Sequence, residues 1–112
     1  MNDLRRYPRV AVVRPVWIRT SSGVVVQARS TNLSQGGIAV AFEAPAEIGA
    51  ILELSFNLVV RGRQVDFRVQ GVARFNHLSS NGYIIGFQFV KLDDDVSESL
   101  REFVAHKRSM KD

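Results

Sequence analysis

The sequence has no cysteine, two histidines and three prolines among its 112 residues. The absence of cysteine excludes a disulfide framework and a thiolate metal site, and it favours a cytoplasmic location. His77 and His106 show no metal-ligand spacing, so we predict no metal centre. No apolar run approaches the roughly 20 residues that cross a bilayer, and the charged start is not followed by the apolar stretch of a signal peptide. We therefore expect a single domain without membrane insertion.

The motifs of the common enzyme classes are also absent. There is no P-loop and no G-x-G-x-x-G, and Ser34 is not part of a G-x-S-x-G nucleophile elbow. Asp93, Asp94 and Asp95 are contiguous, which suits the start of a helix better than a general acid–base pair. We predict that the protein is not an enzyme and that it carries no cofactor.

Arginine is in excess near the start of the chain. The net charge is +4, and residues 1–30 hold a single acid, Asp3. The arginines of this segment are Arg5, Arg6, Arg9, Arg14, Arg19 and Arg29. A guanidinium group matches a phosphate or the edge of a guanine with two parallel hydrogen bonds, which lysine cannot do. This charge predicts an anionic partner, and the alternative is a solvated basic tail.

Alternating apolar residues predict six β-strands and a final helix. The strands are expected at about residues 10–20, 24–30, 38–42, 52–58, 65–72 and 83–90. Pro15 puts the first strand at an edge or on a bulge, and Gly71 suggests a bulge or a barrel corner. Short, evenly spaced strands of this kind indicate an all-β fold. We predict a six-stranded antiparallel β-barrel with a C-terminal α-helix packed on it.

The helix is expected to begin at Asp93–Asp95, where acidic side chains complement the helix dipole. Asp95 and Glu98 have the spacing of a capping box. The apolar face that should pack on the barrel consists of Val96, Leu100, Phe103 and Val104.

Two short motifs stand out from this pattern. Residues 32–37, Asn-Leu-Ser-Gln-Gly-Gly, predict a turn between strands, because Asn and Ser can bond nearby backbone and paired glycines permit positive φ. Upstream, Arg5 and Arg9 have the spacing R-x-x-x-R. This motif followed by [D/N]-x-S-x-x-G resembles the PilZ family. The resemblance extends over roughly residues 4–107 and includes residues 84–89, which are similar to the last barrel strand of that family.

The resemblance implies a receptor for the bacterial second messenger cyclic di-GMP. By position in the two motifs, its ligand-binding residues would be Arg5, Arg9, Asn32, Ser34 and Gly37, with the adjacent Arg6 as a further phosphate or stacking contact. The arginines would bind phosphates and the O6/N7 edge of guanine. The Asn32 oxygen could accept from guanine N–H groups, although Asp, which the pattern also allows, would add a negative charge there.

We expect residues 1–9 to form a flexible, arginine-rich clamp and residues 10–112 to form the barrel with its helix. Pro8 favours an extended segment, and repulsion among the arginines should keep it mobile until the ligand binds. The ordered segment would then be read by an effector protein, for which motility, pilus or exopolysaccharide machinery are the family-level possibilities. Leu4 adds no further cation before the motif, which favours one bound ligand over a stacked pair.

Two other functions compete with this one. A PilZ-like protein could serve only as a protein-interaction adaptor that does not bind nucleotide. A basic barrel could instead bind single-stranded nucleic acid through exposed aromatic rings. The inward positions of most phenylalanines argue against the second alternative, because they predict a core made of Phe42, Phe56, Phe67, Phe87 and Phe89.

Overall fold

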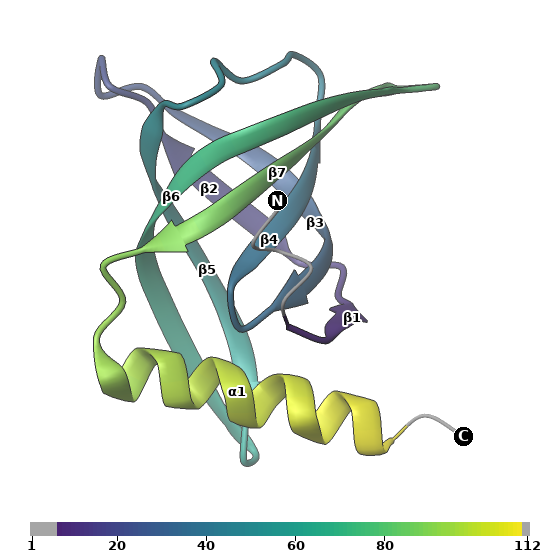
Figure 1. The fold of residues 1–112 in the computed structure, drawn as a ribbon, viewed down its shortest axis with the longest axis vertical. Coiled ribbons are helices and arrows are strands. Elements are labelled where there is room, and N and C mark those ends of the chain that lie inside the picture. The colour runs from purple at the N-terminus through teal and green to yellow at the C-terminus, as the bar shows by residue number, and fades with distance from the viewer. Residues whose placement is uncertain (1–6, 111–112) are drawn as a thin grey trace.

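The computed structural model describes residues 7–110, in which seven strands precede one helix (Figure 1). The remaining residues, 1–6 and 111–112, include the predicted ligand contacts Arg5 and Arg6, which therefore lie outside the described part of the chain. The elements are β1 (Arg9–Ala11), β2 (Pro15–Arg19), β3 (Val25–Ser34), β4 (Gly37–Phe42), β5 (Ile51–Val60), β6 (Arg63–Ser79), β7 (Gly82–Val90) and α1 (Asp94–Ser109).

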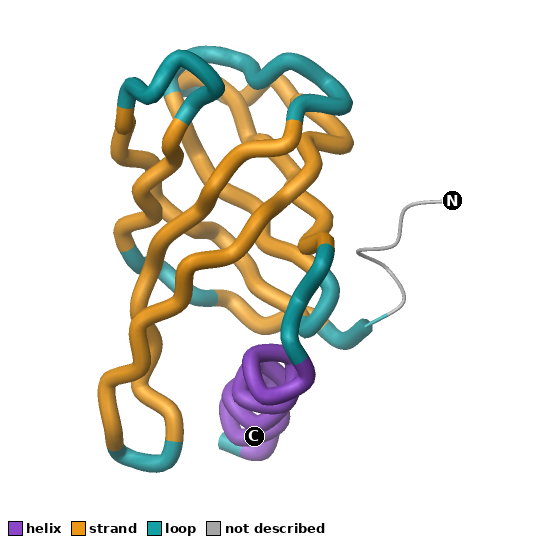
Figure 2. The backbone as a smooth tube through the Cα atoms, turned by 90° about the vertical axis from the view of Figure 1, so that its left-hand side faces the viewer, coloured by secondary structure: helices purple, strands orange, loops and turns teal. Residues whose placement is uncertain are grey.

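Six of these strands form a closed antiparallel barrel. Their order is β3-β2-β5-β6-β7-β4, and an additional pairing of β3 with β4 closes the sheet on itself (Figure 2). Helix α1 lies across one end of the barrel (Figures 1 and 2). The predicted all-β fold, a six-stranded antiparallel barrel with a C-terminal helix, is confirmed.

The first predicted strand, residues 10–20, is divided into β1 and β2. Both pieces pair with β3, β1 near its end and β2 near its start. Between them the chain departs from the ladder, and the buried side chain of Ser30 fills the gap. Its hydroxyl accepts a hydrogen bond from the Arg14 backbone N–H at 2.9 Å and donates one to the Val12 carbonyl at 2.5 Å. Pro15, the residue predicted to mark an irregularity, begins β2.

The barrel interior contains the apolar side of each alternating strand. Leu54, Phe56 and Leu58 of β5 are buried, as their period of two predicts. The predicted phenylalanine core is confirmed for Phe56, Phe67, Phe87 and Phe89, while Phe42 is partly buried against the same cluster. The antiparallel register therefore places most aromatic rings inside the barrel rather than on its surface.

The bulge predicted at Gly71 is wrong. The register of β6 runs without a shift through Gly71, and the irregularity lies between Ala73 and Phe75. Gly71 is required for space instead, because a Cβ atom there would lie 2.8 Å from the Leu54 Cδ1 atom and 3.2 Å from the Phe87 Cβ atom. The absence of a side chain leaves room for Leu54 and Phe87 of the two adjacent strands, β5 and β7.

Helix α1 packs through its apolar stripe. Leu100 and Val104 are buried, and Val96 and Phe103 are partly buried against the barrel core, as predicted. The predicted capping box is wrong, because the helix N-cap is Asp93 and the Glu98 side chain bonds Arg101 instead. Within residues 7–110, no helix combines the length and the apolar character needed to cross a membrane.

Replacing Ser30 with alanine should destabilise the fold. The change leaves the Val12 carbonyl and the Arg14 N–H without their side-chain partner, which costs about 1–3 kcal/mol for buried groups. Urea denaturation of the two proteins measures the difference. Ser21→Ala, in the exposed turn after β2, should change the free energy of unfolding by less than about 0.5 kcal/mol. Equal effects of the two substitutions would contradict a structural role of the Ser30 hydroxyl.

Candidate functional site

The two sequence motifs meet through the pairing of β1 with the end of β3. Arg9 lies opposite Ser34 in this ladder, Val10 opposite Leu33 and Ala11 opposite Asn32. Arg9 is exposed, and its side chain makes no hydrogen bond or ion pair with any described residue. The second arginine of R-x-x-x-R is thus a free cation beside the Asn-x-Ser-x-x-Gly segment.

The turn predicted over residues 32–37 is shorter in the structure, because β3 continues to Ser34 and β4 begins at Gly37, so that only residues 35–36 connect the strands. The Ser34 side-chain oxygen accepts hydrogen bonds from the backbone N–H groups of Gly36 and Gly37, both at 3.1 Å. Ser34 is only 1% exposed, and Gly37 is buried at the start of β4. The hydroxyl that the motif predicts as a ligand contact therefore serves the shape of the turn in this structure.

The turn does not use the left-handed conformation that its paired glycines allow. Among the described glycines, positive φ angles occur at Gly23, Gly49, Gly62 and Gly82. The shape of residues 34–37 depends instead on the hydrogen bonds of Ser34 and on the pairing of Gly37 with Gln88 across β4 and β7.

Asn32 differs from Ser34 in having a free side chain. It is half-buried on β3, where it lies opposite Ala11 on one side and Ala39 on the other, next to a register shift after Ser30. Its amide makes no hydrogen bond with the described residues. The alanines on both sides leave the amide without a large neighbour across either strand.

A pocket of about 200 Å³ lies next to the turn, between the barrel and the start of α1. Its walls are Tyr7, Gln35, Gly36, Gln88, Phe89, Leu92 and Ser97. The Gln35 amide donates to the Ser97 hydroxyl at 3.0 Å and so connects the turn to the helix. The Arg74 guanidinium donates to the Gln88 side-chain oxygen at 2.6 Å.

The two motifs do not identify Gln35 and Gln88 as residues of this site, although the sequence contains part of the information. Gln35 is a variable position inside the turn motif, and Gln88 alternates with the buried Phe87 and Phe89 on β7. A polar residue flanked by buried aromatics on a barrel strand must face outward. Only the pairing of Gly37 with Gln88 shows that this outward position borders the turn.

Neither histidine belongs to this site. The rings of His77 and Phe75 are 4.8 Å apart, and His106 lines a different pocket on the other side of α1. No group of three or more His, Asp or Glu side chains in residues 7–110 has the arrangement of a metal site.

Comparisons with known proteins agree with the motifs. The family model of the PilZ domain matches residues 3–106. The Bacillus subtilis inhibitor of motility, MotI/DgrA, has a similar fold, with a TM-score of 0.86 and 21% identity over 96% of this chain and 52% of that one. YcgR from Escherichia coli, solved in complex with cyclic di-GMP, has a TM-score of 0.80 and 17% identity over 94% of this chain and 46% of that one.

The chain thus spans about half the length of MotI and YcgR. A structure of the isolated PilZ domain of YcgR with cyclic di-GMP matches at a TM-score of 0.71 and 15% identity, over 94% of this chain and 92% of that domain. No curated protein sequence matches this chain. At these identities the structural matches establish the fold.

Ser34→Ala and Asn32→Ala should differ in their effect on stability, because Ser34 supports the turn and Asn32 has a free side chain. Loss of the Ser34 hydroxyl removes the acceptor of two backbone N–H groups and should cost about 1–3 kcal/mol of stability. Asn32→Ala removes no hydrogen bond and should cost about 0.5 kcal/mol or less. Thermal and urea unfolding measure both values. A larger loss from Asn32→Ala than from Ser34→Ala would contradict this assignment.

Proposed function

We propose a function from one premise: this chain belongs to the PilZ domain family. The proposal is that it binds cyclic di-GMP on the outside of its barrel and passes the signal to a partner protein. Two of the structures that share its fold, whole YcgR and the isolated PilZ domain of YcgR, were solved with cyclic di-GMP. The single observation that carries the proposal to this chain is the β1–β3 register, which brings Arg9 beside Asn32 and Ser34.

Each described residue of this group suits one part of the dinucleotide. Arg9 offers an unpaired guanidinium fork, which matches a phosphate or the O6/N7 edge of guanine. The free amide of Asn32 can accept from the guanine N–H groups and donate to O6. Gly36 and Gly37 carry no side chain, so a flat ring can approach the backbone of the turn.

Ser34 would act as a positioning residue in this site. Its buried hydroxyl fixes the two glycine N–H groups, and through them the surface that Asn32 and Arg9 flank. Arg5 and Arg6 lie outside the described residues and remain predicted contacts by their position in the motif.

We further propose that residues 1–9 close on the bound ligand as a clamp. The segment is tied to the barrel by β1, which begins at Arg9. A ligand with two phosphates would draw the arginines onto the barrel surface, and the ordered segment would change the surface that a partner meets. One of the similar structures is an inhibitor of motility, so a motility component is one class of partner to test.

Isothermal titration calorimetry with cyclic di-GMP tests the proposal. The protein should bind cyclic di-GMP saturably, and GTP or a short oligonucleotide should give no comparable heat. Arg9→Ala should weaken binding about tenfold to a hundredfold, because it removes a charge-assisted hydrogen bond worth about 1.5–3 kcal/mol. Its free energy of unfolding should change by less than about 0.5 kcal/mol, because the side chain is exposed and unpaired.

Arg68→Ala is the matched control. Arg68 is also an exposed arginine, but it lies on β6, opposite β3 in the closed strand order, and its contact with Glu53 is long at 3.9 Å. It should leave cyclic di-GMP affinity unchanged. If the wild-type protein gives no heat and no shift of its melting temperature at high nucleotide concentration, the receptor proposal fails and the adaptor function stands in its place.

A further inference from the structure

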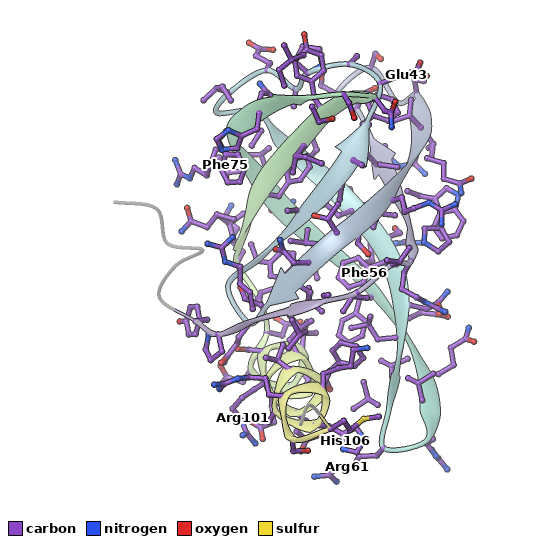
Figure 3. The ribbon with its side chains drawn as sticks, turned by 90° about the vertical axis from the view of Figure 1, so that its right-hand side faces the viewer. Glu43, Phe56, Arg61, Phe75, Arg101 and His106 are labelled. Atoms are coloured by element: carbon purple, nitrogen blue, oxygen red, sulfur yellow. The ribbon has the colours of Figure 1, made fainter. Side chains whose placement is uncertain are left out.

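A larger pocket lies on the other side of α1 from the turn. It has a volume of about 580 Å³ and separates the tip of the β5–β6 hairpin from the middle of the helix. Figure 1 shows this hairpin crossing the helix and extending beyond it, and Figure 3 shows Arg61, Arg101 and His106 at this end of the molecule. We call this pocket the hairpin–helix groove, and its walls include Val59, Arg61, Arg101, Phe103 and His106.

An ion pair joins the two walls of the groove. The Arg61 guanidinium contacts the Glu102 carboxylate at 2.5 Å and so joins the hairpin tip to the helix. Arg61 and Gly62 both have positive φ, 53° and 76°, the backbone pattern of a tight type I′ hairpin turn. On the helix, Arg101 donates to Glu98 at 3.0 Å, and this hydrogen bond lowers the pKa of the Glu98 carboxyl. The ion pair and the tight turn therefore place the hairpin tip beside the helix.

The groove exposes apolar surface between these polar walls. Val59 is 55% exposed, Phe103 is only partly buried, and Ala105 is exposed on the helix. Apolar side chains gathered in a concave site, rather than scattered singly over a surface, are typical of a binding groove.

The charge around the groove is positive. Glu102, the acid among its lining residues, is already paired with Arg61, and the lining Arg101 is paired with Glu98 of the same helix. Arg63 follows the lining residue Gly62 at the hairpin tip, and Lys107 follows the lining residue His106 on the helix; neither has an acidic partner among the described residues. The negative end of the α1 dipole offsets only about half an elementary charge. Two cations without an acidic partner in residues 7–110 therefore adjoin, in sequence, the residues that line this apolar groove.

We infer that the hairpin–helix groove binds an acidic, amphipathic segment of a partner protein. Apolar anchors of such a segment would enter between Val59 and Phe103, and its acidic face would meet the cations of the hairpin and of the helix end. A nucleic acid strand fits less well, because stacking needs exposed rings and the groove offers only Phe103, which is partly buried. This binding needs no nucleotide, so it is separable from the cyclic di-GMP proposal.

Two synthetic peptides of opposite charge test the inference. Each has about 14 residues, roughly four helical turns, with leucines at helical spacing. The other positions are mostly glutamate in one peptide and mostly lysine in the other. Titrated into ¹⁵N-labelled protein without nucleotide, the glutamate peptide should shift the amide signals of residues 59–62 and 101–106. The lysine peptide should not bind.

A matched pair of substitutions locates the site. Val59→Glu and Val59→Lys remove the same exposed apolar side chain from the groove but add opposite charges. Val59→Glu should weaken binding of the glutamate peptide at least about tenfold more than Val59→Lys does, because like charges repel across a binding surface. Val13→Glu, at another exposed valine between β1 and β2, should leave its affinity unchanged.

Three results would overturn the inference. These are equal binding of the two peptides, no binding of the glutamate peptide at millimolar concentration, and shifts that map away from the groove. Because Val59 is exposed, all variants should keep the melting temperature and the spectrum of the wild-type barrel, so that a loss of affinity reports on the groove.

Discussion

The pairing of β3 with three other strands is the interaction on which the barrel and its candidate site both depend. β3 pairs with β2 near its start and with β1 near its end, while its opposite edge pairs with β4 and closes the barrel. Two buried serines on this strand support the arrangement, since Ser30 bridges the interruption between β1 and β2 and Ser34 fixes the turn into β4. A loss of this pairing would therefore separate Arg9 from Asn32 as well as open the barrel.

Helix α1 lies between the two surfaces to which we assign functions. On one side, Ser97 bonds Gln35 of the β3–β4 turn, and on the other, Glu102 bonds Arg61 of the hairpin. Arg101 and Ala105 line both the hairpin–helix groove and a smaller pocket of about 160 Å³ that includes Pro8 and Gln35. If cyclic di-GMP binds at the turn as proposed, a displacement of Gln35 or of the segment around Pro8 would act on the helix that forms one wall of the groove. Under these two proposals the packed helix would connect the nucleotide to the partner, because a helix packed on both faces moves as one unit.

The sequence was sufficient to predict the architecture and to select candidate site residues. Period-two alternation predicts β5 and its buried face because burial on one side of a strand leaves a local pattern. The division of residues 10–20 and the role of Gly71 could not be predicted, because both depend on atoms brought near by long-range pairing: Ser30 in the first case, Leu54 and Phe87 in the second. The motifs predict Arg9, Asn32 and Ser34 as ligand contacts, but a motif cannot distinguish an exposed side chain from a buried one. That distinction for Ser34 depends on its burial and on the N–H groups it bonds.

The structure also reduces the number of arginines in residues 1–30 that are free to bind an anion. The arginines of residues 1–30 predict an anionic partner as a group, yet two of them are engaged in the fold, since Arg14 bonds Asn57 and Arg19 pairs with Glu53. In the described part of this segment, only Arg9 and Arg29 have no such partner. A dinucleotide with two phosphates and two guanines needs more guanidinium forks than Arg9 alone can supply. If the receptor proposal is correct, Arg5 and Arg6 must therefore provide much of the binding free energy, and Arg9 would define where on the barrel they act.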